Sequence, residues 1–184
     1  MATVYKIWAD DDYQALDSVN YEAYSAARKK TWKFDGYPID GKFEKVEMYV
    51  RQPTLKKPDI WELANTLAFE DGAAAKVQLC LDQAGQQFKL AFAGRKLVVL
   101  NVTYVIDCLD KMLSVYDPDL PHMIDKYVFH EDRLDYSLFK IPETQHAAIL
   151  TVEGLASPDD EFKPLVEKHG LKGLRFEELW SSGK

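Results

Sequence analysis

The stretch AAAKVQLCLDQAGQQFKLAFAGRKLVVLNV, residues 73–102, decides the fold. Its first part predicts a helix over Ala73–Ala84, because apolar side chains recur there at the helical spacing i, i+3, i+4 and i+7. These side chains are Val77, Cys80, Leu81 and Ala84. Asp71 is expected to accept backbone N–H groups at the start of the helix. Gly85 is expected to end it in a left-handed conformation.

The second part of the stretch predicts a β-hairpin. Phe88–Phe92 and Lys96–Val102 are rich in β-branched and aromatic residues, and Ala93-Gly94-Arg95 supplies a turn between them. Strands and helices do not alternate regularly enough along the chain for a doubly wound parallel sheet. The pattern therefore favours an α+β fold with a mixed or mostly antiparallel sheet.

Downstream, the sequence predicts a helix, a loop, three strands, and a final helix with a closing strand. The ranges are a helix at Tyr104–Leu113, a loop at Asp117–Lys126, and strands at Tyr127–Phe129, Ser137–Ile141 and Ala147–Val152. The final helix, at about 158–169, is the best marked in the chain. Ser157 can cap it, Pro158 suits its first position, and Gly170 ends it. Leu174–Leu179 alternates apolar with charged residues and is the predicted closing strand.

Upstream, the chain opens with an alternating strand, Thr3–Trp8, and then becomes rich in turn residues. A short helix is expected to end at Ala26–Lys30, and a short strand to cover Val46–Val50. Asp59–Leu67 is expected to pack over the core as a short helix or strand.

Length and composition agree with a single folded domain. The chain has 184 residues, of which 47% are hydrophobic and 12% aromatic, so a sizeable core is available and disorder is excluded. We predict one α+β domain over residues 1–184, with a loop-rich N-terminal part at 1–70 and a core at 71–180.

Charge and hydropathy exclude two classes of protein. The net charge of −7 argues against a nucleic-acid binder with a basic surface. The longest apolar run, Lys96–Tyr104, is too short to span a membrane. The N-terminus lacks the basic and apolar segments of a secretory signal, so we expect a cytoplasmic protein.

The residues that could carry catalysis or bind a metal are scattered. The histidines lack metal-ligand spacing, Asp10–Asp12 lacks the glycine and glutamate of a calcium loop, and no glycine-rich phosphate motif is present. Cys80 and Cys108 lie in apolar surroundings and are interpreted as buried thiols. His130 beside Glu131 resembles an acid/base pair. The sequence otherwise predicts no catalytic residue, metal or cofactor.

The net charge is concentrated in one segment. Residues 1–60 are neutral, whereas residues 107–135 carry eight acidic against three basic side chains, a net charge of −5. The acidic residues are Asp107, Asp110, Asp117, Asp119, Asp125, Glu131, Asp132 and Asp135. Apolar anchors for a partner are expected at Tyr116, Met123, Tyr127 and Phe129. Such a surface would steer a basic partner; the alternative is a polar face that only keeps the protein in solution.

Five segments together resemble a known bacterial family. They are VYKIW at 4–8, LVVLNVTYVIDCLDKMLSVY at 97–116, YVFHEDRL at 127–134, SLFKIPE at 137–143 and FKPLVEKHGLKGLRFEELW at 162–180. In this order and spacing the chain resembles the eleventh immunity-protein family of bacterial polymorphic toxin systems. The sharpest similarity lies at Leu100–Asp110 and Gly170–Trp180.

The resemblance implies a protein without enzymatic activity that binds and neutralises a cognate toxin domain. It also implies recurrent positions that build the fold: Asn101, Asp107, Asp110, Phe139, Gly173, Phe176 and Trp180. The strand that is usually rich in tyrosine in this family reads KLVVLNV here, which argues against a functional tyrosine in it.

Three functional hypotheses follow. The preferred one is an immunity protein whose acidic surface at 107–135 covers a basic catalytic face of the toxin. A toxin with an acidic face would instead meet the basic runs at 28–33 or 56–57. The second is a small-molecule-binding or hydrolytic domain that uses His130 and Glu131 in a cleft. The third is a structural, self-assembling domain.

Overall fold

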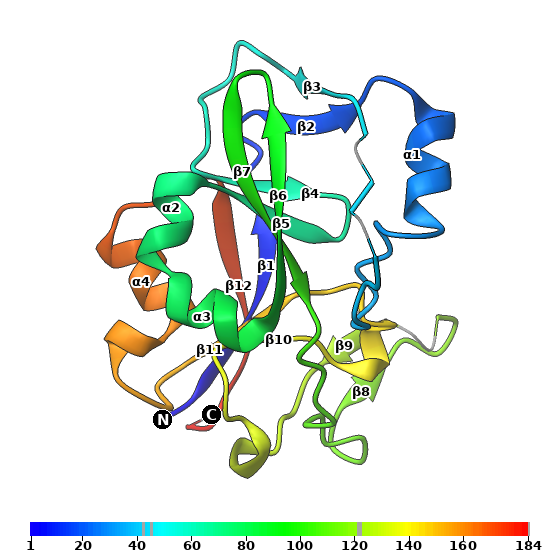
Figure 1. The fold of residues 1–184 in the computed structure, drawn as a ribbon. Helices are drawn as coiled ribbons and strands as arrows, with labels where there is room; N and C mark the ends of the chain where they lie inside the picture. Colours follow the sequence, from blue (N-terminus) through cyan, green and yellow to red (C-terminus); the bar gives the residue numbers. More distant parts are fainter. Residues whose placement is uncertain (42, 45, 121–122, 184) are drawn as a thin grey trace.

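The computed structural model describes residues 1–41, 43–44, 46–120 and 123–183, and these form two four-stranded antiparallel sheets (Figure 1). The terminal sheet holds, in spatial order, β10 (Leu138–Phe139), β11 (Leu150–Glu153), β1 (Thr3–Ala9) and β12 (Leu174–Ser181). The β7 sheet holds β4 (Ile60–Leu63), β5 (Thr66–Glu70), β7 (Arg95–Val102) and β6 (Gly85–Phe92). The two ends of the chain therefore meet in one sheet, where Val4 pairs with Trp180.

Strand β7 lies between two hydrophobic layers, because both of its faces are buried. Leu97 and Val99 belong to one hydrophobic cluster, whereas Leu100 and Val102 belong to another. Successive side chains of a strand point to opposite faces, so each face of the sheet supplies one cluster. The nearly continuous apolar run of β7 is the signature of a strand covered on both sides.

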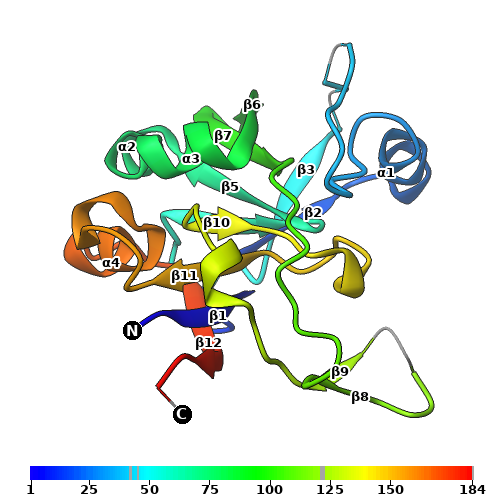
Figure 2. The ribbon, with the colours of Figure 1, turned by 90° about the horizontal axis from the view of Figure 1, so that it is seen from below.

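The central cluster lies between the two sheets and is completed by helices. It unites Phe69 of β5 with Ile7 of β1 and Leu138 of β10. Three helices contribute to it, α2 (Asp71–Lys76), α3 (Gln78–Ala84) and α4 (Phe162–Lys168). Figure 2 shows these three helices gathered on one side of the molecule.

Two outer layers cover the remaining faces of the sheets. The other face of the β7 sheet packs against a cluster that includes Trp32 and Ala27 of α1 (Tyr21–Arg28). A small sheet of β2 (Ala15–Ser18) and β3 (Met48–Arg51) joins this layer. The other face of the terminal sheet is covered by residues between 104 and 134, among them Leu109.

The prediction of an α+β fold with mostly antiparallel sheets is confirmed, as is a closing strand after the last helix. Strand β1 and the hairpin β6–β7, with its turn at Ala93 and Gly94, also lie where the sequence predicts them. The segment Asp59–Leu67 forms β4 and the start of β5 rather than a helix. Within the described residues no helix is long and apolar enough to cross a membrane.

The predicted helix Ala73–Ala84 is two helices. The fully buried Val77, with φ −122° and ψ 18°, interrupts it between α2 and α3. Asp71 does not cap this helix, because Glu70 occupies the N-cap position and makes no side-chain cap hydrogen bond. Gly85 is not left-handed helical either. Its φ is 157° and its ψ −144°, and a Cβ there would lie 2.2 Å from the carbonyl oxygen of Asn101.

The predicted helix Tyr104–Leu113 does not form. This segment is irregular and extended, and its backbone bonds to distant partners: Ile106 N–H donates to the carbonyl of Lys140 (3.0 Å) and Asp110 N–H to that of Val128 (2.8 Å). Val105, Cys108 and Leu109 have helical spacing. The segment nevertheless buries Cys108 and Leu109 against the terminal sheet. Tertiary pairing overrides the local pattern.

The other differences concern element boundaries. The strand predicted at Tyr127–Phe129 is reduced to one bridge between Leu109 and Phe129. The strands predicted at Ser137–Ile141 and Ala147–Val152 are the shorter β10 and the shifted β11. The final helix is preceded by a 3-10 turn over Pro158–Asp160, in which Ser157 accepts a hydrogen bond from Asp159 N–H (3.4 Å). In the loop predicted at Asp117–Lys126, Pro121 and His122 lie outside the described residues.

Candidate functional site

The predicted acidic segment folds back on itself, and we call its described residues, 107–120 and 123–135, the acidic hairpin. Its arms are joined by the short ribbon of β8 (Val115–Tyr116) and β9 (Ile124–Lys126). Near its base, His130 N–H donates to the carbonyl of Cys108 at 2.8 Å. In Figure 2 the ribbon projects from the body of the molecule, away from the helices.

Apolar side chains at the base fix the acidic hairpin to the terminal sheet. Cys108, Leu109, Phe129 and Leu134 are buried in one cluster with side chains of β1, β10 and β11. The ring of Phe129 packs edge-on to that of Trp180, with 5.8 Å between the ring centroids. Phe129 is only 4% exposed, so its predicted role as an anchor for a partner is wrong. It anchors the hairpin itself.

Both cysteines are buried and free. Burial raises the pKa of the Cys80 thiol and of the Cys108 thiol to about 12. Neither thiol is therefore ionised near neutral pH, and both act as small apolar side chains in the core. Their interpretation as buried thiols is confirmed.

Four of the eight predicted carboxylates serve the hairpin's own structure. Asp110 accepts the N–H groups of Met112 and Leu113, and Asp117 accepts those of Asp119 and Leu120. Each aspartate thereby stabilises a turn. Asp107 pairs with Lys111 at 3.1 Å, and Asp135 accepts the hydroxyl of Tyr104.

The other four carboxylates are exposed and make no ion pair with any described residue. They are Asp119, Asp125, Glu131 and Asp132. Two of the three basic side chains are also engaged within the protein. Lys111 bridges Asp107 and Glu143, and Arg133 donates to the carbonyl of Asp107 at 3.0 Å. The surface of the hairpin is therefore dominated by unpaired negative charge.

Exposed apolar side chains share this surface. Met112 is 91% exposed and Met123 51%, and four more large apolar side chains between 113 and 136 are at least one third exposed. These four are Leu113, Val115, Leu120 and Tyr136. Sequence reasoning found Met123 but missed the others, because the helical spacing placed Met112 on a buried face. Tyr116 and Tyr127 are half-buried and pack against the cluster that contains Phe129.

The alternative pair, His130 and Glu131, lies at the foot of the same hairpin. The imidazole Nε2 of His130 is 4.0 Å from Asp110 Oδ2, and Glu131 is exposed in a 3-10 turn. Neither residue lines the cavity described below. Within the described residues, no group of three or more acidic, histidine or cysteine side chains is placed to hold a metal ion.

Three of the positions that the family resemblance assigns to the fold are buried or closely packed. Asn101 is fully buried and donates to the carbonyl of Tyr37 at 2.9 Å. Phe139 is fully buried beneath the acidic hairpin, and Gly173 approaches the backbone of Ile60 too closely for any side chain.

No protein-family model and no curated protein matches this chain. The resemblance to the eleventh immunity-protein family therefore stands on the motifs quoted above.

Proposed function

We propose that this protein is an immunity-type binding protein that neutralises a cognate toxin domain by covering it with the acidic hairpin. The observation that carries this proposal is the composition of one projecting surface. Unpaired carboxylates and exposed methionine and leucine side chains belong to this one segment. A protein interface commonly combines an apolar centre with a charged rim, and this hairpin offers both.

The two kinds of side chain have different tasks in this proposal. Asp119, Asp125 and the carboxylates near them raise the rate at which a basic face arrives, because opposite potentials steer diffusing partners. Met112, Met123 and their apolar neighbours slow dissociation, because buried apolar anchors carry most of the binding free energy of an interface. Methionine suits this role, since its flexible thioether adapts to the surface it meets.

Inhibition then needs only occlusion. A toxin that acts on nucleic acid or another anionic substrate presents a basic catalytic face, and an acidic protein seated on that face blocks the substrate. The acidic hairpin is held to the core by Leu109 and Phe129, so the ribbon of β8 and β9 extends from a packed base. The alternative, a hydrolytic or small-molecule site at His130 and Glu131, has less support because the two residues lie on an exposed turn.

The test reverses charge only at carboxylates that do not stabilise the hairpin. The variant Asp119→Lys, Asp125→Lys, Glu131→Lys leaves the turn-stabilising Asp110 and Asp117 in place. The partner is the toxin domain encoded beside this gene, and association is followed by surface plasmon resonance at several salt concentrations. We expect the association rate constant to fall by at least about tenfold and its salt dependence to weaken.

The matched control carries the same charge change elsewhere. Asp12, Asp40 and Glu47 are exposed and lie outside the acidic hairpin, so the variant with these three changed to Lys has the same net charge. It should bind nearly as fast as the wild type at physiological salt. Equal affinity and equal salt dependence of the hairpin variant and the wild type would disprove the role of this surface.

A further inference from the structure

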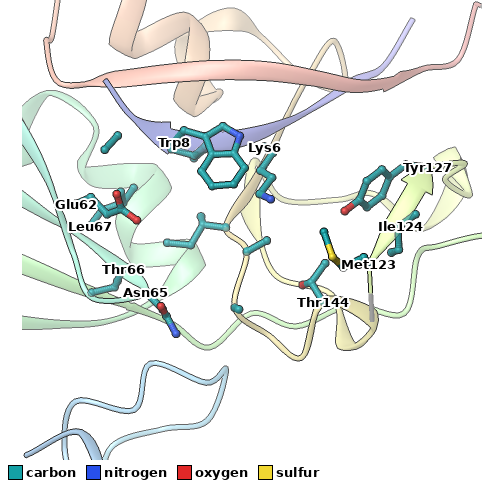
Figure 3. A pocket seen from close by; sticks show the side chains of 15 residues that line it. Lys6, Trp8, Glu62, Asn65, Thr66, Leu67, Met123, Ile124, Tyr127 and Thr144 are labelled. Atoms are coloured by element: carbon teal, nitrogen blue, oxygen red, sulfur yellow. The ribbon is translucent and has the colours of Figure 1, made fainter. Parts of the chain in front are cut away.

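A cavity of about 370 Å³ lies between the terminal sheet, the β7 sheet and the acidic hairpin. Strand β1 supplies Lys6 and Trp8, the turn from β4 to β5 supplies Asn65, and β5 supplies Leu67. The hairpin closes another side with Met123, Ile124 and Tyr127, and Thr144 and residues 147–149 form the remaining wall (Figure 3). This volume is within the range of small-molecule sites, which also favour junctions between structural units.

Lys6 is the unusual group in this cavity. Its ammonium Nζ lies 3.7 Å from the centre of the Trp8 ring, and no carboxylate of the described residues pairs with it within 4.0 Å. Burial lowers the pKa of Lys6, while the more distant Glu177 opposes this shift. Glu177 itself accepts the indole N–H of Trp8 at 2.6 Å. A half-buried ammonium held on an indole face without an ion-pair partner leaves its charge available to an anion.

A hydroxyl group and an apolar surface complete the site. In Figure 3 the ammonium of Lys6 and the hydroxyl of Tyr127 point toward the same space. Burial raises the pKa of Tyr127, so its hydroxyl keeps its proton and can donate a hydrogen bond. Around this polar end the lining is mainly apolar, from Trp8, Leu67, Ile124 and Ile149.

We propose that this cavity binds a small organic monoanion, a carboxylate on an apolar and preferably aromatic body. The carboxylate pairs with the ammonium of Lys6 and accepts a hydrogen bond from the hydroxyl of Tyr127, since hydrogen bonds that involve a charged group are the strongest available here. The body packs against the indole of Trp8 and the side chain of Leu67. Binding replaces water around an ammonium that has no ion-pair partner within 4.0 Å among the described residues.

Glu62 restricts the site to monoanions. It lines the cavity from β4, and Figure 3 shows it at the end where Leu67 lies. Burial raises the pKa of its carboxyl, Asp11 adds to the rise, and Arg51 opposes it. A second carboxylate on the ligand would meet this like charge, whereas a neutral or hydrogen-bond-donating group would not. This inference does not depend on toxin binding.

The test measures binding of defined probes by isothermal titration calorimetry. Phenylacetate and indole-3-acetate are the monoanions, phenylacetamide is the neutral analogue, and 2-phenylsuccinate is the dianion. We expect saturable binding of the monoanions, with the amide and the dianion weaker by at least about tenfold. The same carboxylate chemistry could come from a peptide C-terminus. We test this source with a tetrapeptide that ends in a free phenylalanine carboxylate and with its C-terminal amide. Tighter binding of the free peptide than of phenylacetate would identify a peptide terminus as the ligand.

The variants locate the site. Lys6→Met keeps the apolar length of the side chain and should reduce phenylacetate affinity to that of phenylacetamide. The control Lys89→Met removes an exposed lysine of β6 outside the cavity and should bind phenylacetate like the wild type. If Lys6→Met unfolds, Tyr127→Phe takes its place with a smaller expected loss. No saturable binding of any carboxylate by the wild type, or unchanged binding by Lys6→Met, would overturn the proposal.

Discussion

At the scale of single residues, Lys140 is the most consequential polar side chain in the core. It is completely buried directly after β10, and its ammonium donates to the carbonyl oxygens of Phe34 and Asn65. These two carbonyls belong to separate loops of the N-terminal part of the chain. Among the described residues no carboxylate lies within ion-pair distance of Lys140. Burial lowers the pKa of Lys140 to about 8, and the charge of Asp35 opposes this shift only in part.

The lowered pKa of Lys140 predicts a specific dependence of stability on pH. Between pH 8 and 10.5 the unfolded chain still binds the proton that the folded protein has released, so this lysine makes the free energy of unfolding rise with pH. Cys80 and Cys108 act in the opposite direction above about pH 9, because burial raises their pKa values. Both thiols are present in Lys140→Met, so the difference between the two proteins isolates the lysine.

We expect the stability of the wild type relative to Lys140→Met to grow by about 2 kcal/mol from pH 7 to pH 10. Urea unfolding at unit pH intervals measures it. Parallel stability curves for the two proteins would show that Lys140 does not release its proton in this range.

The sequence around Lys140 gives no signal of this role. In SLFKIPE the lysine reads as an outward-facing charge in a strand, and its two carbonyl partners lie 75 or more residues away. The excess of negative charge within residues 107–135 is easier to predict, because it follows from counting acidic and basic residues. What could not be predicted is which of them stabilise turns, since Asp110 and Asp119 look alike until the turns are known.

At the scale of elements, local patterns succeed where an element carries its own packing information. Strand β7 is apolar on both faces, and α4 has Phe162, Leu165 and Val166 on one face, so both could be located from the sequence. The segment 104–113 has an equally good helical pattern. Its hydrogen-bond partners, however, are Lys140 and Val128, which no local pattern can reveal.

The turn between α4 and β12 shows how one glycine connects two sheets. Gly173 has φ 111°, and a Cβ there would lie 2.2 Å from the carbonyl oxygen of Ile60 and 2.5 Å from Cβ of Pro58. The same turn holds β4 and β1 in place. The carbonyl of Lys172 accepts the N–H of Ile60 at 3.0 Å, and that of Gly173 accepts the N–H of Asp10 at 3.0 Å.

Two glycine substitutions compare a left-handed position in open space with this closely packed one. Gly170 has φ 61° and open space where a Cβ would lie, so Gly170→Ala should cost only about 1 kcal/mol of stability. Gly173→Ala combines a φ of 111°, outside the left-handed region that L residues adopt, with a clash against backbone atoms, and should cost about 3 kcal/mol or more. Thermal and urea unfolding of both variants measure the difference. Equal losses would show that the turn can move away from Ile60 without cost.

At the scale of the whole molecule, the layers differ in how they can open. Some can open only when the whole protein unfolds, whereas others can open locally. The β7 sheet is covered on both faces, by the central cluster and by the cluster around Trp32. The terminal sheet is likewise covered on both faces, but one of its covers is the acidic hairpin. The ribbon of β8 and β9 pairs over only a few residues and carries exposed side chains on the outside. The proposed binding surface thus belongs to the layer with the least packing and strand pairing to support it.

This arrangement predicts a wide range of amide hydrogen exchange rates. Amides of β5 and β7 should exchange only through global unfolding, because their strands are interior and both faces are buried. Amides at 112–117 should exchange through local opening and at least about a hundredfold faster. Hydrogen exchange followed by mass spectrometry compares the two regions directly.

A bound toxin domain should slow exchange at 112–117 and leave β7 unchanged, because only the outer layer gains new contacts. Equal protection of the two regions in the free protein would mean that the acidic hairpin opens only together with the core, as a rigid part of the fold.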